Sequence, residues 1–232
     1  MKNILTIAII LFAGLYSCTK EMNEKLDMAG EWQFQTDPDD RGENEEWYKT
    51  DLSETINLPG SMVENGKGSD ITLETEWTGG IRNPEWYKDP NYAPYFDPEN
   101  IRFPFWLQPL KKYTGAAWYQ KTVTIPENWD GKSVFLSLER PHWQSSVWVN
   151  GLKVASQNSL ATPHIYEITD FVKAGENRIS VCIDNRTEKV DVGINSHSIT
   201  DHTQTNWNGI VGDISLEAKG NIHFENLYLT QN

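Results

Sequence analysis

The chain has 232 residues and the apolar content of an ordinary globular protein, which excludes wholesale disorder. Its length allows one large all-β domain or two small ones, and it excludes a complete (β/α)₈ barrel of about 250 residues beside another domain. The net charge of -13 would repel nucleic acid and anionic lipid headgroups, so neither is an expected partner.

The first 17 residues have the pattern of a targeting segment. Lys2 supplies a positive start, residues 4–12 are apolar, and residues 15–18 (LYSC) follow; the segment is too short to span a membrane. The last four residues resemble the bacterial lipoprotein signal, in which the cysteine becomes the lipidated first residue. We expect a lipoprotein signal peptide at 1–17 and a lipid on Cys18, with an ordinary secretory signal as the alternative. The protein would then be exported to the cell envelope, lipid-anchored in the periplasm or outer membrane of a Gram-negative bacterium, and it would meet the membrane only through this lipid.

Residues 18–30 contain few large apolar groups, which predicts a tether followed by a globular domain at 31–232. The other cysteine, Cys182, lies in a strand-like apolar run and is predicted to be a small packed side chain. With Cys18 lipidated, no intramolecular disulfide is expected.

From Glu31 onward, alternating apolar runs recur and no window of a dozen residues shows a helical period, so the fold class is all-β. Asn150 and Gly151 separate two alternating runs, which is the signal of a hairpin with a type I′ turn. The strands expected from these patterns are residues 119–125, 134–139, 147–149, 152–155, 177–184, 213–216 and 222–229.

Two long segments, 36–54 and 77–113, connect these strands. The second is rich in aromatic residues, which makes its disorder improbable. An antiparallel jelly-roll β-sandwich with long aromatic loops accommodates the whole pattern. Aromatic residues make up 12% of the chain, so some rings are expected to line a surface that binds something flat and weakly polar, such as a sugar. The alternative is that the rings fill a thick core.

Seven short motifs, in order and at consistent spacings, resemble the N-terminal sugar-binding domain of glycoside hydrolase family 2. They are GEW at 30–32, INLPGS at 56–61, YTGAAWY at 113–119, VWVNG at 147–151, ITD at 168–170, AGEN at 174–177 and WNGI at 207–210. The family contains β-galactosidases, β-glucuronidases and β-mannosidases. The resemblance implies a galactose-binding-like jelly roll, in agreement with the strand pattern, and a β-linked oligosaccharide or polysaccharide as the partner.

In complete members of this family, both catalytic glutamates lie in a separate barrel. A retaining mechanism needs two carboxyl groups about 5–5.5 Å apart. The family's acid/base glutamate follows an asparagine, and the Asn-Glu pairs of this chain, at 23–24 and 44–45, lie in the predicted tether and in an acidic loop. We therefore expect no catalytic residue here and no hydrolysis by this chain alone.

Related enzymes reach the sugar from a polar loop that here spans residues 196–207. The position of the sugar-binding aspartate of well-known β-galactosidases falls on Thr203 or Thr205, so Asp201 replaces it only if the loop is longer. A second candidate surface is residues 140–143, where Pro141 is expected to aim the next two side chains out of the sandwich near the same rim. The predicted sugar-binding residues are His142, Trp143, Asp201, His202, Asn206 and Trp207. The alternatives are an ordinary polar loop and a packed strand connection.

The histidines lack His-x-His or His-x₃-His spacing, so no transition metal and no other cofactor is expected; a structural Ca²⁺ in the loops stays open. Two functions fit the sequence: the accessory domain of a family 2 glycoside hydrolase, with the catalytic barrel on another part or on a separate catalytic chain, or a free-standing membrane-tethered glycan-binding lipoprotein. A purely structural subunit that docks on a separate barrel is a third, marked by an exposed apolar patch.

Overall fold

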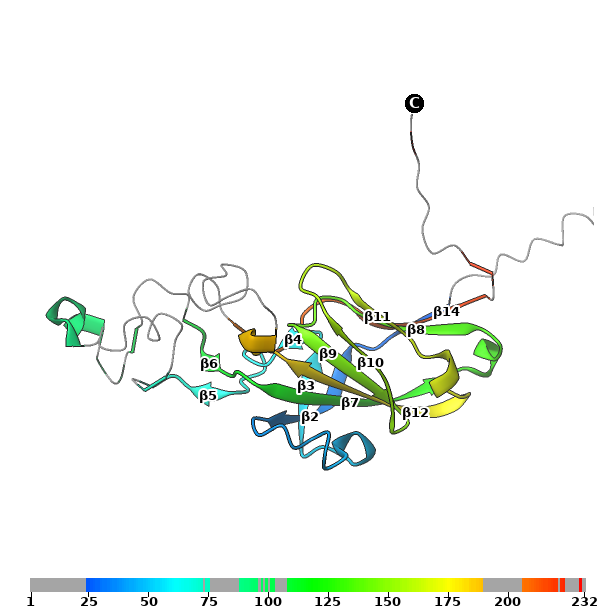
Figure 1. Ribbon diagram of the computed structural model, residues 1–232, viewed down its shortest axis with the longest axis horizontal. Coiled ribbons are helices and arrows are strands. Elements are labelled where there is room, and N and C mark those ends of the chain that lie inside the picture. Colours follow the sequence, from blue (N-terminus) through cyan, green and yellow to red (C-terminus); the bar gives the residue numbers. More distant parts are fainter. Residues whose placement is uncertain are drawn as a thin grey trace, which may run out of the picture.

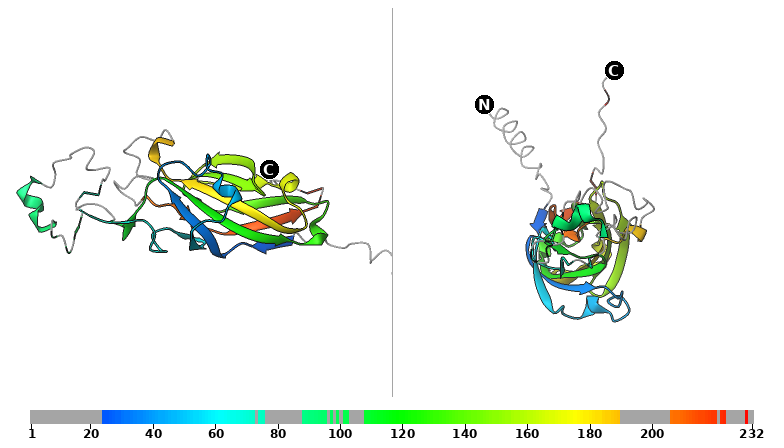
Figure 2. Two further views of the ribbon diagram at one scale, coloured as in Figure 1. Left: turned by 90° about the horizontal axis from the view of Figure 1, so that it is seen from below. Right: turned by 90° about the vertical axis from the view of Figure 1, so that its left-hand side faces the viewer.

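The computed structural model describes residues 24–72, 74–75, 88–95, 97, 99, 101–102, 108–189, 206–220, 222–223 and 230. In this part of the chain, two antiparallel sheets pack face to face in an elongated sandwich (Figure 1 and Figure 2). The predicted all-β jelly-roll class is confirmed.

The larger sheet has six strands in the spatial order β10-β9-β12-β7-β2-β3, and the smaller has four in the order β1-β14-β8-β11. The larger sheet contains β2 (Gly30–Asp37), β3 (Glu54–Leu58), β7 (Ala116–Ile125), β9 (Gln144–Val149), β10 (Leu152–Asn158) and β12 (Gly175–Asp184). The smaller contains β1 (Glu24–Asp27), β8 (Ser133–Leu138), β11 (His164–Glu167) and β14 (Ile214–Lys219). Two short pairs, β4 (Gly60–Ser61) with β13 (Gly209–Ile210) and β5 (Ser69–Asp70) with β6 (Lys111–Lys112), complete the strands.

The described helices are single 3₁₀ turns or little more. They are η1 (Trp47–Lys49), η3 (Pro90–Tyr95), η4 (Glu127–Trp129), η5 (Thr169–Phe171) and η6 (Thr187–Lys189). Among the described residues, none of these helices has the length and apolar character needed to cross a membrane.

Local sequence explains the strands that were predicted. In β8, Val134, Leu136 and Leu138 are buried and alternate with partly exposed residues, because successive side chains of a strand point to opposite faces. The predicted hairpin is also confirmed. Asn150 and Gly151 have φ values of 51° and 82°, the conformation that a type I′ turn requires, and they join β9 to β10.

The main core lies between the two sheets and contains the inward side chains of both. From the larger sheet come Trp32, Phe34, Tyr119 and Val181, each at most 1% exposed. The burial of such large apolar groups stabilises the sandwich by about 25 cal/mol for each Å² removed from water.

A second, smaller cluster covers the outer face of the larger sheet. Residues 38–53, between β2 and β3, fold back over this face, and we call them the covering segment. Their Trp47 and Leu52 pack on Trp118 and Trp148, which point away from the main core. Tyr48 stacks on Trp148 with ring centroids 5.4 Å apart and planes 9° from parallel. Much of the aromatic content therefore fills cores, the alternative that composition alone left open.

The buried carboxylate of Asp37 fixes this covering segment. It accepts hydrogen bonds from the backbone N–H groups of Arg41 and Gly42 at 2.7 and 2.8 Å, and from the Trp118 indole at 3.0 Å. One side chain thus joins the start of the segment to the sheet below it.

The structure corrects the predicted start of the domain. Residues 24–30 were expected in the tether, but Glu24–Asp27 form β1, which pairs with β14 at the edge of the smaller sheet. Met28 is fully buried and its carbonyl accepts a hydrogen bond from the Trp32 indole. The polar residues of β1 are compatible with a strand because its backbone hydrogen bonds do not depend on apolar side chains.

The predicted strand at 222–229 lies largely outside the described residues. Of its first two members, Ile222 is 97% exposed, and neither Ile222 nor His223 lies in a strand. Residues 1–23, with Cys18, also lie outside the described part of the chain.

The sandwich has two distinct ends (Figure 1). At one end, which carries η4 and η5, β1 begins and β14 ends side by side, since Glu24 pairs with Ala218. At the other end β7 begins at Ala116, β12 ends at Asp184 and β9 begins at Gln144. We call this second end, together with the adjoining residues 140–143, 185–186 and 206–210, the rim.

Candidate functional site

The rim brings together two segments that are far apart in the sequence. Pro141 forms an isolated antiparallel bridge with Ile210, and the backbone N–H of His142 donates to the carbonyl of Gly209 at 3.0 Å. As a result, the rings of His142 and Trp207 stack with their centroids 4.4 Å apart and their planes at 21°. The expectation that these two residues lie near the same rim is confirmed.

The environments of the two stacked rings differ. Trp207 is partly exposed, whereas His142 is only 5% exposed. Burial lowers the pKa of His142 to about 4, although contact with the Asn206 side chain acts in the opposite direction. His142 is therefore neutral at pH 7, and its Nε2 has no hydrogen-bond partner among the described residues. A neutral, buried imidazole can support the indole of Trp207 but carries no charge to a ligand.

Three asparagines hold this part of the rim in place. The Asn185 amide accepts from the Gly115 N–H at 2.8 Å and donates to the Asn206 Oδ1 at 3.2 Å, while Asn206 donates back to the Asn185 carbonyl at 3.0 Å. Asn208 donates to the carbonyls of Gly115 and Ile183, both at 3.0 Å, and its Oδ1 accepts from the Tyr119 hydroxyl at 2.7 Å. The amides thus fix the backbone on both sides of Trp207.

Trp143 occupies a different position from the one predicted. Its side chain is 0% exposed, so the prediction that it points out of the sandwich is wrong, and the near-complete burial of His142 corrects the same expectation. The ring packs beside His142, with centroids 5.5 Å apart. The segment is the packed strand connection that was the alternative, because the bridge to Ile210 holds residues 141–143 against the small β4–β13 pair.

Two of the predicted sugar-binding residues, Asp201 and His202, lie outside the described residues, as does Cys18. The described members that the structure brings together at an accessible place are thus Asn206 and Trp207, with His142 beneath them.

An ion-pair network at the rim was not predicted. The Arg186 guanidinium binds the Asp184 carboxylate through Nε at 2.9 Å and the Asp40 carboxylate through Nη1 at 2.7 Å. Both carboxylates raise the pKa of Arg186 above its ordinary value. A sequence signal for this network is the Asp-Asn-Arg run at 184–186, where the long strand β12 ends, because side chains at strand ends come together at one end of a sandwich.

A pocket of about 290 Å³ lies beside this network and contains four carboxylates, so it is the described place where an acid/base pair could be sought. All four have donors. Asp37 binds the covering segment, Asp40 and Asp184 bind Arg186, and Glu43 accepts from the Lys153 ammonium at 2.7 Å. Each carboxylate is thus held by donors of this chain, which suits a structural role better than proton transfer.

Within the described ranges, no group of three or more histidine, cysteine, aspartate or glutamate side chains is arranged to hold a metal ion. The rim as described is a polar surface with one partly exposed aromatic ring and fixed amides. Such a surface can stack on a flat, weakly polar ligand and bind its hydroxyl groups.

Comparison with known proteins agrees with the motifs and with the fold. The family described as glycosyl hydrolases family 2, sugar binding domain, matches residues 24–220. A β-glucuronidase of Paenibacillus borealis is 28% identical over 163 residues, which are 70% of this chain and 21% of that protein. A β-galactosidase of Streptococcus thermophilus is 24% identical over 213 residues, 90% of this chain and 18% of that protein.

Among solved structures, a β-glucuronidase of an uncultured Clostridium species superposes with a TM-score of 0.58 at 18% identity, covering 89% of this chain and 30% of its own. This likeness shows the fold. The chain spans about a fifth of the length of the curated relatives it matches. The family match begins at Glu24, where β1 begins, and ends at Gly220, directly after β14. The chain therefore belongs to glycoside hydrolase family 2, of which it carries the sugar-binding domain.

Proposed function

We propose that the rim binds carbohydrate and that the face of Trp207 is the platform for a sugar ring. The observation that carries the proposal is the fixed, partly exposed indole of Trp207, stacked at 4.4 Å on a neutral His142 and flanked by the anchored amide of Asn206. The C–H face of a pyranose packs on an indole, and its hydroxyl groups exchange hydrogen bonds with amides. A surface of this kind is shallow, so affinity for a single sugar is expected to be weak.

The domain serves, in this proposal, as the accessory sugar-binding part of a family 2 glycoside hydrolase that acts on a β-linked oligosaccharide or polysaccharide. The relatives named β-glucuronidase and β-galactosidase support this role, because the matched part is about a fifth of each. The alternative is a free-standing, membrane-tethered glycan-binding lipoprotein. The two functions differ in whether the rim binds a glycan alone. In an accessory domain the rim completes a pocket on another domain, whereas in a free-standing module it binds oligosaccharide by itself.

Calorimetric titration of the purified chain with methyl β-glucuronide, methyl β-galactoside and a β-linked oligosaccharide tests the rim. Removal of the ring in Trp207→Ala is expected to weaken binding roughly two- to tenfold, the value of an aromatic contact. Phe171→Ala, which removes another partly exposed aromatic ring in η5 at the opposite end, is the control and should bind as the wild type does. Equal titrations for wild type and Trp207→Ala would remove the rim from consideration, and flat titrations across all glycans would exclude the free-standing module.

We further propose that the protein is exported and carries a lipid on Cys18. The apolar run at 4–12 and the LYSC sequence at 15–18 support this. Expression in a bacterial host with an alkyne-labelled fatty acid should label the wild type, and Cys18→Ser should lose both the label and the detergent-phase partition. Cys182→Ser is the matched control and should keep the label; labelling that survives Cys18→Ser would refute the assignment.

A further inference from the structure

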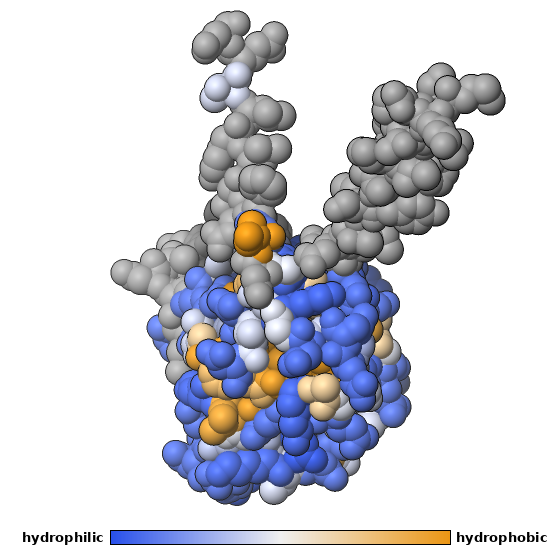
Figure 3. All heavy atoms as spheres, turned by 90° about the vertical axis from the view of Figure 1, so that its right-hand side faces the viewer, coloured by the Kyte–Doolittle hydropathy of each residue, from blue (hydrophilic) through white to orange (hydrophobic). Residues whose placement is uncertain are grey.

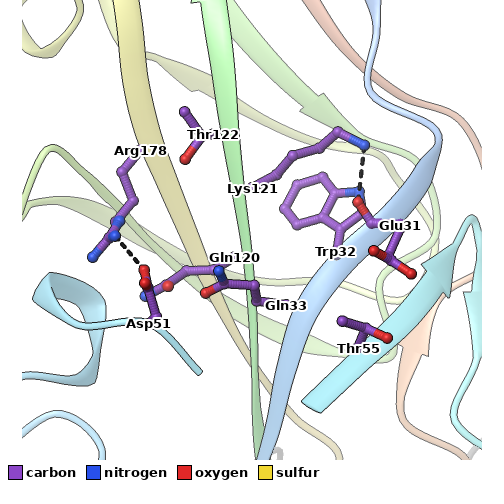
Figure 4. Close-up of a pocket in the computed structure, with 9 residues that line it drawn as sticks. All are labelled: Glu31, Trp32, Gln33, Asp51, Thr55, Gln120, Lys121, Thr122 and Arg178. Atoms are coloured by element: carbon purple, nitrogen blue, oxygen red, sulfur yellow. Dashed lines mark hydrogen bonds and ion pairs between the residues drawn. The ribbon is translucent and has the colours of Figure 1, made fainter. Parts of the chain in front are cut away.

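The outer face of the larger sheet holds a second pocket, away from the rim. Its volume is about 260 Å³, and it lies between the end of the covering segment and strands β2, β3 and β7 (Figure 4). We call it the outer-face pocket. Its lining residues are Glu31, Trp32, Gln33, Asp51, Thr55, Gln120, Lys121, Thr122 and Arg178. Neither Trp207 nor any of the three rim asparagines contributes to it.

Two glutamines lie next to each other in this pocket. Gln33 of β2 and Gln120 of β7 are directly paired in the sheet, so their side chains leave the same face (Figure 4). The Gln120 Nε2 donates to the carbonyl of Trp47 at 2.8 Å, which fixes the orientation of the amide. Its Oε1 therefore remains an acceptor, and this oxygen has no hydrogen-bond partner among the described residues although Gln120 is only 2% exposed.

The neighbouring amide is complementary. Gln33 uses its Oε1 to accept from the Leu52 N–H at 3.0 Å, and in the described part of the chain its NH₂ group donates to no other residue. One buried acceptor and one available donor thus stand side by side. A hydroxyl group is both donor and acceptor, so a single hydroxyl can donate to Gln120 and accept from Gln33. Leaving the buried acceptor unmatched is unfavourable, which favours an occupant.

The charges of the pocket favour an uncharged ligand. Glu31 and Asp51 balance Lys121 and Arg178, and both cations have partners (Figure 4). The Arg178 guanidinium donates to the Lys49 carbonyl at 2.7 Å and to Asp51 at 2.5 Å, and the Lys121 ammonium donates to the carbonyls of Ala29 and Glu31 at 3.0 and 3.1 Å. The threonine hydroxyls of the lining add further groups that can both donate and accept.

We propose that the outer-face pocket binds the hydroxyl-bearing edge of a neutral saccharide, with Gln33 and Gln120 reading one hydroxyl as both donor and acceptor. This site is separate from the rim and does not rest on carbohydrate binding there. It gives the domain a second contact by which an extended glycan is held along the side of the sandwich.

Nuclear magnetic resonance of the ¹⁵N-labelled chain tests the site, with cellobiose as the neutral saccharide and sodium sulfate as the anionic probe. Cellobiose should shift the side-chain amide signals of Gln33 and Gln120 in a saturable way, and sulfate should leave them in place. Gln120→Leu should abolish the response of Gln33. Thr122→Val, which removes one hydroxyl from the lining, should raise the dissociation constant for cellobiose roughly three- to tenfold.

Thr124→Val is the matched control, because Thr124 is also exposed on β7 and points to the same face but does not line the pocket. Thr124→Val should bind cellobiose as the wild type does. If Gln120→Leu fails to fold, the comparison of Thr122→Val with Thr124→Val still tests the site. Trp207→Ala should leave the glutamine shifts unchanged, so that failure of the rim and failure of this site are distinguishable. Absence of any glutamine shift would mean that only water occupies the pocket, and an equal response to sulfate would mean an anion site; either outcome overturns the proposal.

Discussion

The buried imidazole of His142 makes the stability of the domain depend on pH. Its pKa is about 4 in the folded chain, against an ordinary value of 6.5, because burial penalises the charged form. Between these two values, the unfolded chain binds a proton that the folded chain does not, so the free energy of unfolding falls as pH falls from 6.5 towards 4. A difference of 2.5 pKa units corresponds to about 3 kcal/mol between pH 7 and pH 4. Because His142 is only 5% exposed, solvent screening reduces this value little.

Urea unfolding of the wild type and His142→Phe at several pH values measures this contribution. Phenylalanine keeps a flat ring beneath Trp207 but does not titrate, so the variant should lose about 3 kcal/mol less stability between pH 7 and pH 4 than the wild type. His164, whose pKa burial also lowers, contributes a loss of the same sign in both proteins and cancels in the difference. Parallel slopes for the two proteins, or an NMR titration of the His142 ring near pH 6.5, would refute the reasoning.

Three further outcomes are expected. Gly209→Ala should lower stability by about 2–4 kcal/mol in urea unfolding, because φ is +142° and a Cβ would lie 2.5 Å from the Gly60 carbonyl oxygen; Gly66→Ala, where φ is +67° and nothing lies within 4 Å, should cost only about 1 kcal/mol. In a Cys18→Ser chain, Ellman's reagent at pH 8 should react with the partly exposed Cys182 more slowly in the folded than in the unfolded chain, because desolvation raises the pKa of this thiol; equal rates for the two states would contradict this. The 232-residue chain alone should not hydrolyse aryl β-glucuronides or β-galactosides, and turnover that persists through purification to homogeneity would show a catalytic pair that we have not recognised.

The sequence predicted what depends on neighbouring residues. The Asn150–Gly151 hairpin and the alternation in β8 follow from local backbone and side-chain preferences, and both are present. β1 was missed because its four residues carry little apolar signal and its pairing with β14 joins residues about 190 positions apart. The ion pair of Arg186 with Asp40 spans 146 residues and has no local signal either.

Prediction of the site had the same limits. The family likeness placed Asn206 and Trp207 in a loop at the rim, and the predicted strand connection at 140–143 placed His142 near the same rim. Periodicity does not reveal whether a given ring is inside or outside at a strand end, and Trp143 is buried where exposure was expected. The rings of Trp118 and Trp148 likewise face away from the main core but are covered by a segment that follows β2, which only the tertiary structure shows.

The adjacent positions of Glu24 and Ala218 determine how the domain can be presented. Strand β1 begins and β14 ends at the end of the sandwich that carries η4 and η5, which we call the base. The 10 residues of β12 separate the base from the rim by about 33 Å. Six peptide units between Cys18 and Glu24 reach at most about 20 Å, so a lipid there would hold the base near the membrane and aim the rim outwards. A polypeptide attached after Lys219 would likewise start at the base, and it would have to extend back along the whole sandwich before it could share a ligand with Trp207.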